Sequence, residues 1–226
     1  RVCGRLLREF FESAGFREAF YAAPAAVRHH QNYPGGLLEH TINVTSLALA
    51  IAGSYASAGQ PALSYNGRPL AMDRQVLIAA GLLHDIGKME TYRLSPLADV
   101  TEQQMWEGHL AIGYAAVRAR CEPLLTSPPY PQAVDELRKL LHCILSHHGK
   151  LEFGSPIEPA CAEAFILSQA DMTDARLAEI VEAAGQALGQ DPAARWLPRS
   201  LHFPGGVFIG DWAGGEARLA EEERGP

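Results

Sequence analysis

The chain has 226 residues, 47% of them hydrophobic and 20% charged, which is enough for one large core or two small ones. Its net charge of −7 argues against a surface that holds long nucleic acid through phosphate neutralisation alone, because such surfaces are basic. A small phosphate-bearing substrate remains compatible, since bound metal ions supply local positive charge. No apolar run is long enough to span a membrane and no signal peptide is visible, so we expect a cytoplasmic protein.

The cysteines are scattered and show no CxxC spacing: they are Cys3, Cys121, Cys143 and Cys161. They therefore indicate neither a disulfide framework nor a zinc knuckle, and we expect buried thiols in a reducing compartment. The sequence starts at Arg1 rather than at a methionine, which leaves open a further N-terminal region.

The first half of the chain predicts helices separated by turns. Residues 1–20 carry apolar side chains at helical spacing and predict one or two amphipathic helices, broken near Gly15. A loop over 24–36 precedes a long helix over 37–57, which carries His40 in its first turn. Residues 59–72 contain turn dipeptides. The next helix, over 76–83, is apolar on all sides and is N-capped by Asp73.

The second half predicts further helices and a short tail. An irregular stretch or short hairpin is expected at 89–104, followed by a helix over 106–121 with His109 near its start and a stiff connector at 127–131. A helix over 132–148 then ends at Gly149. After a loop come a helix over 160–188 and a small hairpin at 203–208. Residues 216–226 are charged and expected to fray. The fold class predicted is all-α, with a helical domain over 1–190 and a partly irregular C-terminal extension over 191–226.

A histidine and an aspartate stand side by side at the end of the buried helix, within the run Gly81–Lys88. A carboxylate in such a place is costly unless it is paired or bound to a metal. A neutral imidazole with a carboxylate is a ligand pair that suits a divalent ion. Taken alone, the pair is more simply a core histidine beside a capping aspartate.

Other ligand-type side chains also lie at helix ends or on apolar helices. The full set, from five predicted helices, is His40, His84, Asp85, His109, His147, His148 and Asp171. Metal sites in helical bundles are built from side chains that project inward from several helices. A purely structural role would require a separate buried partner for each of these residues. We therefore predict a metal centre.

The order of these residues resembles the HD superfamily of metal-dependent phosphohydrolases. The resemblance is carried by His40, by His84-Asp85 and by the late Asp171. It implies an HD-domain helical bundle in which these positions ligate one divalent metal. In addition, His109 and His147-His148 resemble the subset of the superfamily that binds a second metal, with Asp85 bridging the two ions.

Longer motifs resemble the HD domain of bacterial 3'–5' exoribonucleases of the YhaM type. They are Pro24–Ala26, His29-His30, Gly35–Thr41, His84–Lys88, Gly108-His109, Ile144–Gly149, Leu151–Pro156, Glu163-Ala164 and Asp171–Ala175. Those exonucleases carry an OB-fold before the HD domain, which would supply a single-strand groove and is absent from this sequence. Cyclic-dinucleotide phosphodiesterases of the HD-GYP type share the His147-His148 and Lys88 features, but they rank lower because Gly-Ser-Pro follows the His pair here, where Gly-Tyr-Pro is expected.

The resemblance implies a two-metal phosphohydrolase in which Asp85 and Lys88 are catalytic. Two ions about 3.5–4 Å apart would hold a bridging water as an activated hydroxide and aim it at phosphorus. Lys88 would contact a phosphoryl oxygen, although an ordinary lysine after a helix end is the alternative. His29 and His30 either bind substrate phosphate at the pocket mouth or lie in a plain loop. Asp174 either orients a ligand histidine or is merely exposed.

The expected cofactors are divalent metal ions, two per chain, with Mn or Fe favoured by the histidines and Mg, Ni, Co or Zn possible. The expected substrate is a phosphodiester or phosphomonoester of a nucleotide or short oligonucleotide. A separate nucleic-acid-binding domain or partner would be needed for long strands. Two alternatives stay open on sequence alone: an HD-fold di-iron oxygenase, and a non-catalytic nucleotide-binding module.

Overall fold

The computed structural model describes residues 1–27, 31–56, 64–66, 68–69, 72–94 and 98–210. Its backbone divides into two compact units, Arg1–Asp174 and Ala175–Pro226. Helices dominate the described residues, and the strands among them form only two-stranded antiparallel sheets, so the all-α prediction is confirmed. The domain boundary at residue 190 stays a prediction.

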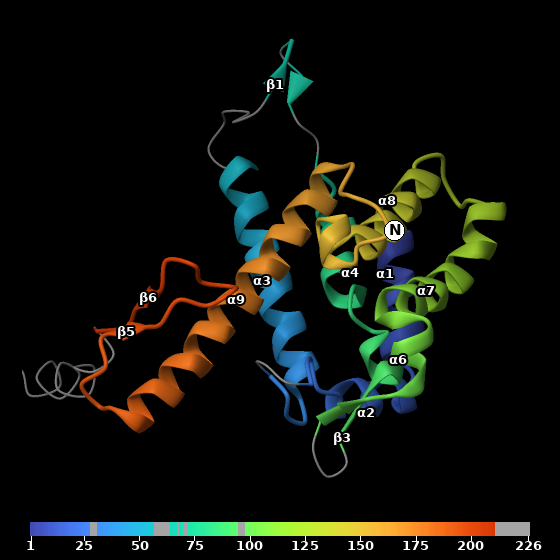
Figure 1. Cartoon of the computed structure of the whole chain (residues 1–226). Helices are drawn as coiled ribbons and strands as arrows, with labels where there is room; N and C mark the ends of the chain where they lie inside the picture. Colours follow the sequence, from blue (N-terminus) through green and yellow to red (C-terminus); the bar gives the residue numbers. More distant parts are fainter. Residues whose placement is uncertain (28–30, 57–63, 67, 70–71, 95–97, 211–226) are drawn as a thin grey trace, which may run out of the picture. The chain divides into compact units, whose positions relative to one another are not determined.

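The first unit is a set of helices joined by turns and small hairpins (Figure 1). Its helices are α1 (Val2–Phe11), α2 (Ala14–Ala22), α3 (Gly36–Ala56), α4 (Arg74–Leu83), α5 (Lys88–Thr91), α6 (Glu102–Trp106), α7 (Gly108–Thr126), α8 (Ala133–Ser146), the 3-10 turn η1 (Leu151–Phe153) and the first part of α9 (Ala162–Gln190). Its hairpins are β1 (Ser64–Tyr65) with β2 (Arg68–Pro69), and β3 (Tyr92–Leu94) with β4 (Ala98–Val100).

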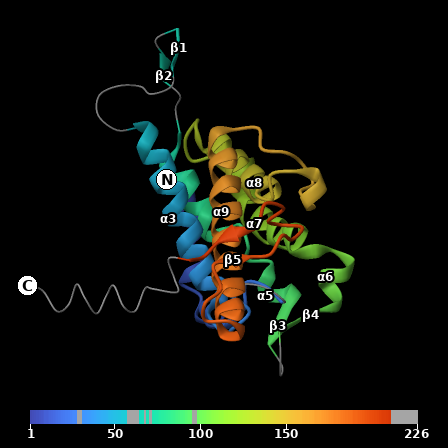
Figure 2. The same ribbon diagram turned by 60° about the vertical axis from the view of Figure 1, so that its left-hand side comes forward.

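Helix α4 lies in the middle of this unit. It packs against α1, α3 and α8 (Figure 1), and α8 packs in turn against α7, its neighbour in Figure 2 as well. The side chain of Asp73 accepts hydrogen bonds from the N–H groups of Gln75 and Val76, so the predicted N-cap is confirmed. Leu77 and Leu83 of α4 are buried against Leu140 of α8 in one core. Each such leucine contributes about 1.5–3 kcal/mol through burial.

The structure differs from the sequence prediction at two helix boundaries. The first break lies at Glu12 and Ser13 rather than near Gly15, because the Ser13 hydroxyl accepts a hydrogen bond from the Phe16 N–H and caps α2. The helix predicted over 106–121 is α7, which begins two residues later, and a separate short helix, α6, precedes it and lies mostly in the stretch predicted to be irregular. Helix α7 continues past Cys121 because the side chain of Leu124 is buried.

The second unit contains the later part of α9 and a small hairpin, β5 (Trp196–Leu197) with β6 (Val207–Phe208). Leu197 and Ile209 pack against Ala184 of α9 in a small core of their own. The predicted hairpin at 203–208 is therefore wrong in its first strand, because Val207–Phe208 pairs with the earlier segment. The rings of Trp196 and Phe208 pack edge to face across that pair.

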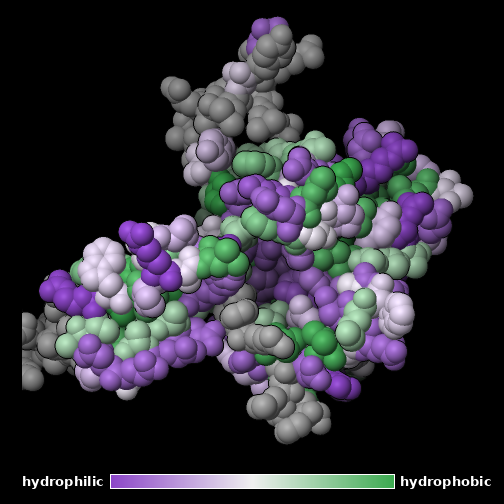
Figure 3. Space-filling model, in the orientation of Figure 1, coloured by the Kyte–Doolittle hydropathy of each residue, from purple (hydrophilic) through white to green (hydrophobic). Residues whose placement is uncertain are grey.

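On the visible face of the first unit in Figure 3, apolar and polar side chains are interspersed. The long apolar runs of the sequence accordingly face the core rather than this surface. None of the helices in the described part of the chain combines the length and the hydropathy that crossing a membrane requires.

Candidate metal centre

The His-Asp pair lies in the turn that links α4 to α5. His84 follows the last residue of α4, and Lys88 begins α5. The side chains of His84 and Asp85 are 0% and 2% exposed. Burying a charged carboxylate costs free energy unless cations or hydrogen-bond donors lie close to it, so the groups around Asp85 must offset that cost.

Two glycines of the same motif let neighbouring helices come close enough to meet the pair. A Cβ on Gly81 would lie 2.5 Å from Thr45 Oγ1, so α3 can approach α4 closely only because this residue is glycine. A Cβ on Gly87 would collide with the carbonyl oxygen of His109, so the same holds for α7. The first contact brings His40 toward the pair, and the second brings His109.

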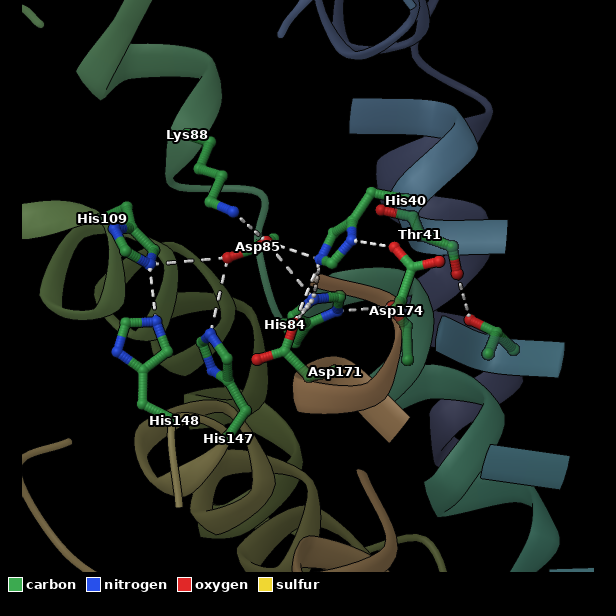
Figure 4. A network of polar contacts seen from close by, with 12 residues as sticks. His40, Thr41, His84, Asp85, Lys88, His109, His147, His148, Asp171 and Asp174 are labelled. Carbon is green, nitrogen blue, oxygen red and sulfur yellow. Dashed lines mark hydrogen bonds and ion pairs between the residues drawn. The ribbon is translucent and has the colours of Figure 1, made fainter. Parts of the chain in front are cut away.

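Two groups of potential ligands result, on either side of Asp85 (Figure 4). One combines imidazoles with carboxylates and is called here the carboxylate cluster: His40, His84, Asp85 and Asp171. The other consists of imidazoles alone and is called the imidazole cluster: His109, His147 and His148. The ligand atoms of His40, His84 and Asp85 lie within 4.8 Å of one another, as do those of the imidazole cluster.

Asp85 presents one oxygen to each cluster. Its Oδ2 lies 3.3 Å from Nε2 of His40 and 3.3 Å from Nε2 of His84. Its Oδ1 lies 3.5 Å from Nε2 of His109 and 3.4 Å from Nε2 of His147. Asp171 adds an oxygen to the first side, 3.1 Å from His40 Nε2.

Hydrogen bonds from Nδ1 orient four of the imidazoles. Each Nδ1 lies within bonding distance of an oxygen, and the pairs are His40 with Asp174 Oδ2 at 2.7 Å, His84 with Gly81 O at 2.8 Å, His147 with Ile144 O at 2.7 Å and His148 with Phe153 O at 2.9 Å. Such a bond places the proton on Nδ1 and leaves the lone pair on Nε2. The Nε2 atoms are the ones that face each other, at 3.3 Å for His40 and His84.

The electrostatics of the two clusters differ. Burial lowers the pKa of His40, but hydrogen bonds with Asp171, Asp174 and Asp85 outweigh it and raise that pKa to about 10. Burial lowers the pKa of His109 well below its usual value, and the charge of Asp85 does not compensate. Without a cation, a proton therefore occupies the carboxylate cluster, whereas His109 stays neutral.

Lys88 lies beside the carboxylate cluster, with Nζ 2.5 Å from Asp85 Oδ2. Burial lowers the pKa of Lys88, but the charge of Asp85 outweighs it, so the side chain remains an ammonium. Tyr92 of β3 borders the same place: its ring centroid lies 6.0 Å from Lys88 Nζ and 6.2 Å from the His109 ring. Sequence reasoning missed Tyr92, because nothing in a short hairpin marks its contact with residues of other elements.

Other polar residues of the motifs and of α8 lie outside the two clusters. Asp174 is buried and hydrogen-bonded to His40, so of its two sequence interpretations the orienting one fits the structure. His142, a further histidine of α8, belongs to neither cluster, and its Nε2 accepts a hydrogen bond from the Ala160 N–H at 2.8 Å. His29 and His30 lie outside the described residues, so their substrate-binding role stays a prediction.

The donor set fits divalent cations. Asp85 Oδ1 and His147 Nε2 are buried without any hydrogen-bond partner, which is costly unless something else satisfies them. Lone pairs of imidazole and carboxylate directed at common points are what a divalent cation satisfies. A helical bundle that aims such side chains inward from α3, α7 and α9 and from the turns after α4 and α8 defines a metal-dependent protein of the all-α class.

Comparison with known proteins specifies the family. A family model described as HD domain matches residues 37–176. The chain belongs to the HD domain family, which confirms the superfamily resemblance seen in the sequence and implies binding of divalent metal.

Curated relatives are similar to this chain over most of its length. The chain is 33% identical to the 3'–5' exoribonuclease YhaM of Listeria monocytogenes serotype 4b (strain F2365), over 72% of this chain and 45% of that protein. It is 33% identical to the YhaM of Bacillus subtilis (strain 168), over 70% of this chain and 44% of that protein. It thus spans about half the length of the curated relatives it matches. No solved structure gives a significant match.

Proposed function

We propose that this chain is a metal-dependent phosphohydrolase that cleaves phosphodiester or phosphomonoester bonds of nucleotides or short oligonucleotides. The observation that carries the proposal is the position of Asp85, whose two oxygens face two separate groups of ligands. A carboxylate that binds through both oxygens holds two cations close together, which is the arrangement used in phosphoryl hydrolysis.

In this proposal His40, His84 and Asp171 hold one cation, the imidazole cluster holds the other, and Asp85 binds both. When bound, divalent cations supply Lewis acidity and lower the pKa of a water molecule. The Nδ1 hydrogen bonds keep the imidazoles in the tautomer that can donate a lone pair. The Lys88 ammonium, adjacent to Asp85, contacts a phosphoryl oxygen of the substrate and stabilises the negative charge that develops on it.

The substrate class rests on two observations. Curated relatives carry the name 3'–5' exoribonuclease, which supports an RNA phosphodiester. The chain itself has 19 Lys and Arg against 26 Asp and Glu, so it neutralises few phosphates at once. We therefore propose that this chain by itself acts on short strands, and that long strands require an additional nucleic-acid-binding domain or partner.

The test is a time course on 5'-labelled RNA strands of different lengths, in the same Mn²⁺ and salt, together with bis-p-nitrophenyl phosphate. We expect hydrolysis of the small diester and of short oligomers, with Mn²⁺ preferred over Mg²⁺ because imidazole ligands favour the softer ion. Asp85→Ala is the control for contaminating nuclease. Processive degradation of a long strand by this chain alone would contradict the substrate proposal. Oxygen uptake without hydrolysis would indicate an oxygenase instead.

A further inference from the structure

Two cysteine thiols meet where α8 passes the start of α9, away from the metal ligands. Cys143 lies within α8 and is 0% exposed, whereas Cys161 directly precedes α9 and is only partly buried. The two thiols lie close enough to influence each other's ionisation: the neighbouring Cys161 raises the pKa of Cys143, and the neighbouring Cys143 lowers the pKa of Cys161. Neither sulfur takes part in the contacts of the two metal clusters, so the pair is a separate chemical feature of the fold.

The surroundings of Cys161 favour its thiolate. The hydrogen bond from Cys143 and a further one from the backbone N–H of Ala164 outweigh burial, and together they lower the pKa of Cys161 to about 7. Ala164 belongs to the first turn of α9, a helix of 29 residues whose N-terminal end carries partial positive charge. A thiolate is the reactive form of cysteine toward oxidants.

A path from solvent reaches Cys161 but not its partner. Cys161 lines a cavity of about 550 Å³, together with the largely apolar residues Ile51, Tyr55, Met72, Phe165 and Ile166. Cys143 is not among the residues that line it. A small uncharged reagent that enters the cavity therefore meets Cys161 first, with Cys143 behind it.

The other two cysteines provide a contrast within the same chain. Cys3 and Cys121 are each 0% exposed. Burial, as the main cause, raises the pKa of both thiols to about 12. They are therefore expected to be inert under conditions in which Cys161 reacts.

We propose that Cys161 is a site of oxidation by peroxides, and that Cys143 resolves the oxidised form to a disulfide joining α8 to the start of α9. The Cys161 thiolate attacks one peroxide oxygen, the O–O bond breaks, and the leaving hydroxide takes a proton to become water. Cys161 is then a sulfenic acid. The Cys143 sulfur attacks the Cys161 sulfur, an S–S bond forms, and the S–O bond breaks. The departing hydroxide combines with the Cys143 proton as a second water.

The experiment treats the metal-loaded chain with a small excess of hydrogen peroxide, blocks the remaining thiols after unfolding, and maps the peptides by mass spectrometry. We expect a peptide pair linked through Cys143 and Cys161, with Cys3 and Cys121 still free thiols, and its loss on adding a thiol reductant. In Cys143→Ala, we expect a Cys161 sulfenic acid that dimedone traps. In Cys161→Ala, Cys143 should stay reduced.

Two results would overturn the proposal: oxidation of Cys3 or Cys121 as fast as Cys161, or conversion of wild-type Cys161 to sulfinic acid without the cross-link. A measurement on the native wild-type chain avoids any dependence on how the variants fold. Iodoacetamide at neutral pH should alkylate Cys161 at least about 10-fold faster than Cys3 or Cys121, since its thiolate fraction is much larger. Equal rates for these thiols would also overturn it.

Discussion

The carboxylate cluster and the imidazole cluster share Asp85 but are built on different chemistry. In the first, Asp85 and Asp171 surround His40, and hydrogen bonds to carboxylates raise the pKa of that imidazole to about 10. In the second, only one oxygen of Asp85 faces the three imidazoles, and burial keeps the pKa of His109 well below its usual value. The same buried turn of the chain thus borders one site rich in carboxylates and one site made of imidazoles.

This difference predicts how each site takes up a cation. Negative charge increases affinity for any divalent ion, although a cation must displace the proton of His40. Neutral imidazoles require no such displacement at His109, but they supply less charge and select softer ions. We therefore expect the carboxylate cluster to fill first, and the imidazole cluster to determine the preference among metals.

The largest effect is expected from removing the residue that the clusters share. Asp85→Ala deletes an oxygen from each site and should abolish both metal loading and hydrolysis. It should also lower the Tm of the chain purified with metal, because binding energy at a buried site is folding energy. Elemental analysis, calorimetry and the diester assay measure these changes. A variant that kept full metal stoichiometry and activity would refute the shared role of Asp85.

The next largest effect separates the two clusters. His109→Ala should leave about one metal per chain, held by the carboxylate cluster, with weak or no turnover. His142→Ala is the matched control, since it removes a histidine of α8 that bonds the Ala160 N–H and belongs to neither cluster. Full metal stoichiometry and turnover in His109→Ala would show that this histidine does not hold an ion.

Much of this comparison follows from the sequence alone. His40, the His84-Asp85 pair and the His147-His148 pair are recognisable because polar ligand residues are rarely buried on apolar helices unless a partner or a metal satisfies them. The helix caps were also predictable where side chains mark them, as Asp73 does for α4. Helix α6 was missed, since its five residues include no buried side chain and so show no apolar pattern in the sequence.

Features that depend on contacts between residues far apart in the sequence could not be predicted from the sequence. The division of Asp85 into one oxygen per cluster is a matter of side-chain placement rather than of spacing. The close approaches at Gly81 and Gly87 depend on α3 and α7, which lie far from them in sequence. The role of Asp174 was equally balanced, because a carboxylate one turn from Asp171 points to the core or to solvent with similar sequence signals.

A smaller effect is expected from changing Lys88. Of the two Asp85 oxygens, its ammonium contacts Oδ2, the one that faces the carboxylate cluster. Lys88→Ala should keep both metals and lower kcat by about 10²–10³-fold, the usual loss when one charge-stabilising donor is removed. Lys88→Arg keeps the positive charge and should retain more of the activity. If Lys88→Ala instead lost metal, the lysine would be structural. If kcat were unchanged, it would have no part in the reaction.

The smallest effect is expected from Asp174, which supports the carboxylate cluster without belonging to it. Its Oδ2 accepts the Nδ1 proton of His40 at 2.7 Å, and this bond keeps Nε2 free to bind a cation. Asp174→Ala should weaken metal affinity by about 10–100-fold at this cluster alone, as loss of such outer partners does. Asp174→Asn retains an accepting oxygen and should lose less metal affinity.

The control for this prediction is Asp135→Ala, a change at an exposed position of α8. Metal titration monitored by calorimetry distinguishes the clusters. The binding step that Asp174→Ala weakens should be the same step that remains in His109→Ala, namely binding to the carboxylate cluster. Equal affinity in Asp174→Ala and the wild type would mean that packing alone orients His40.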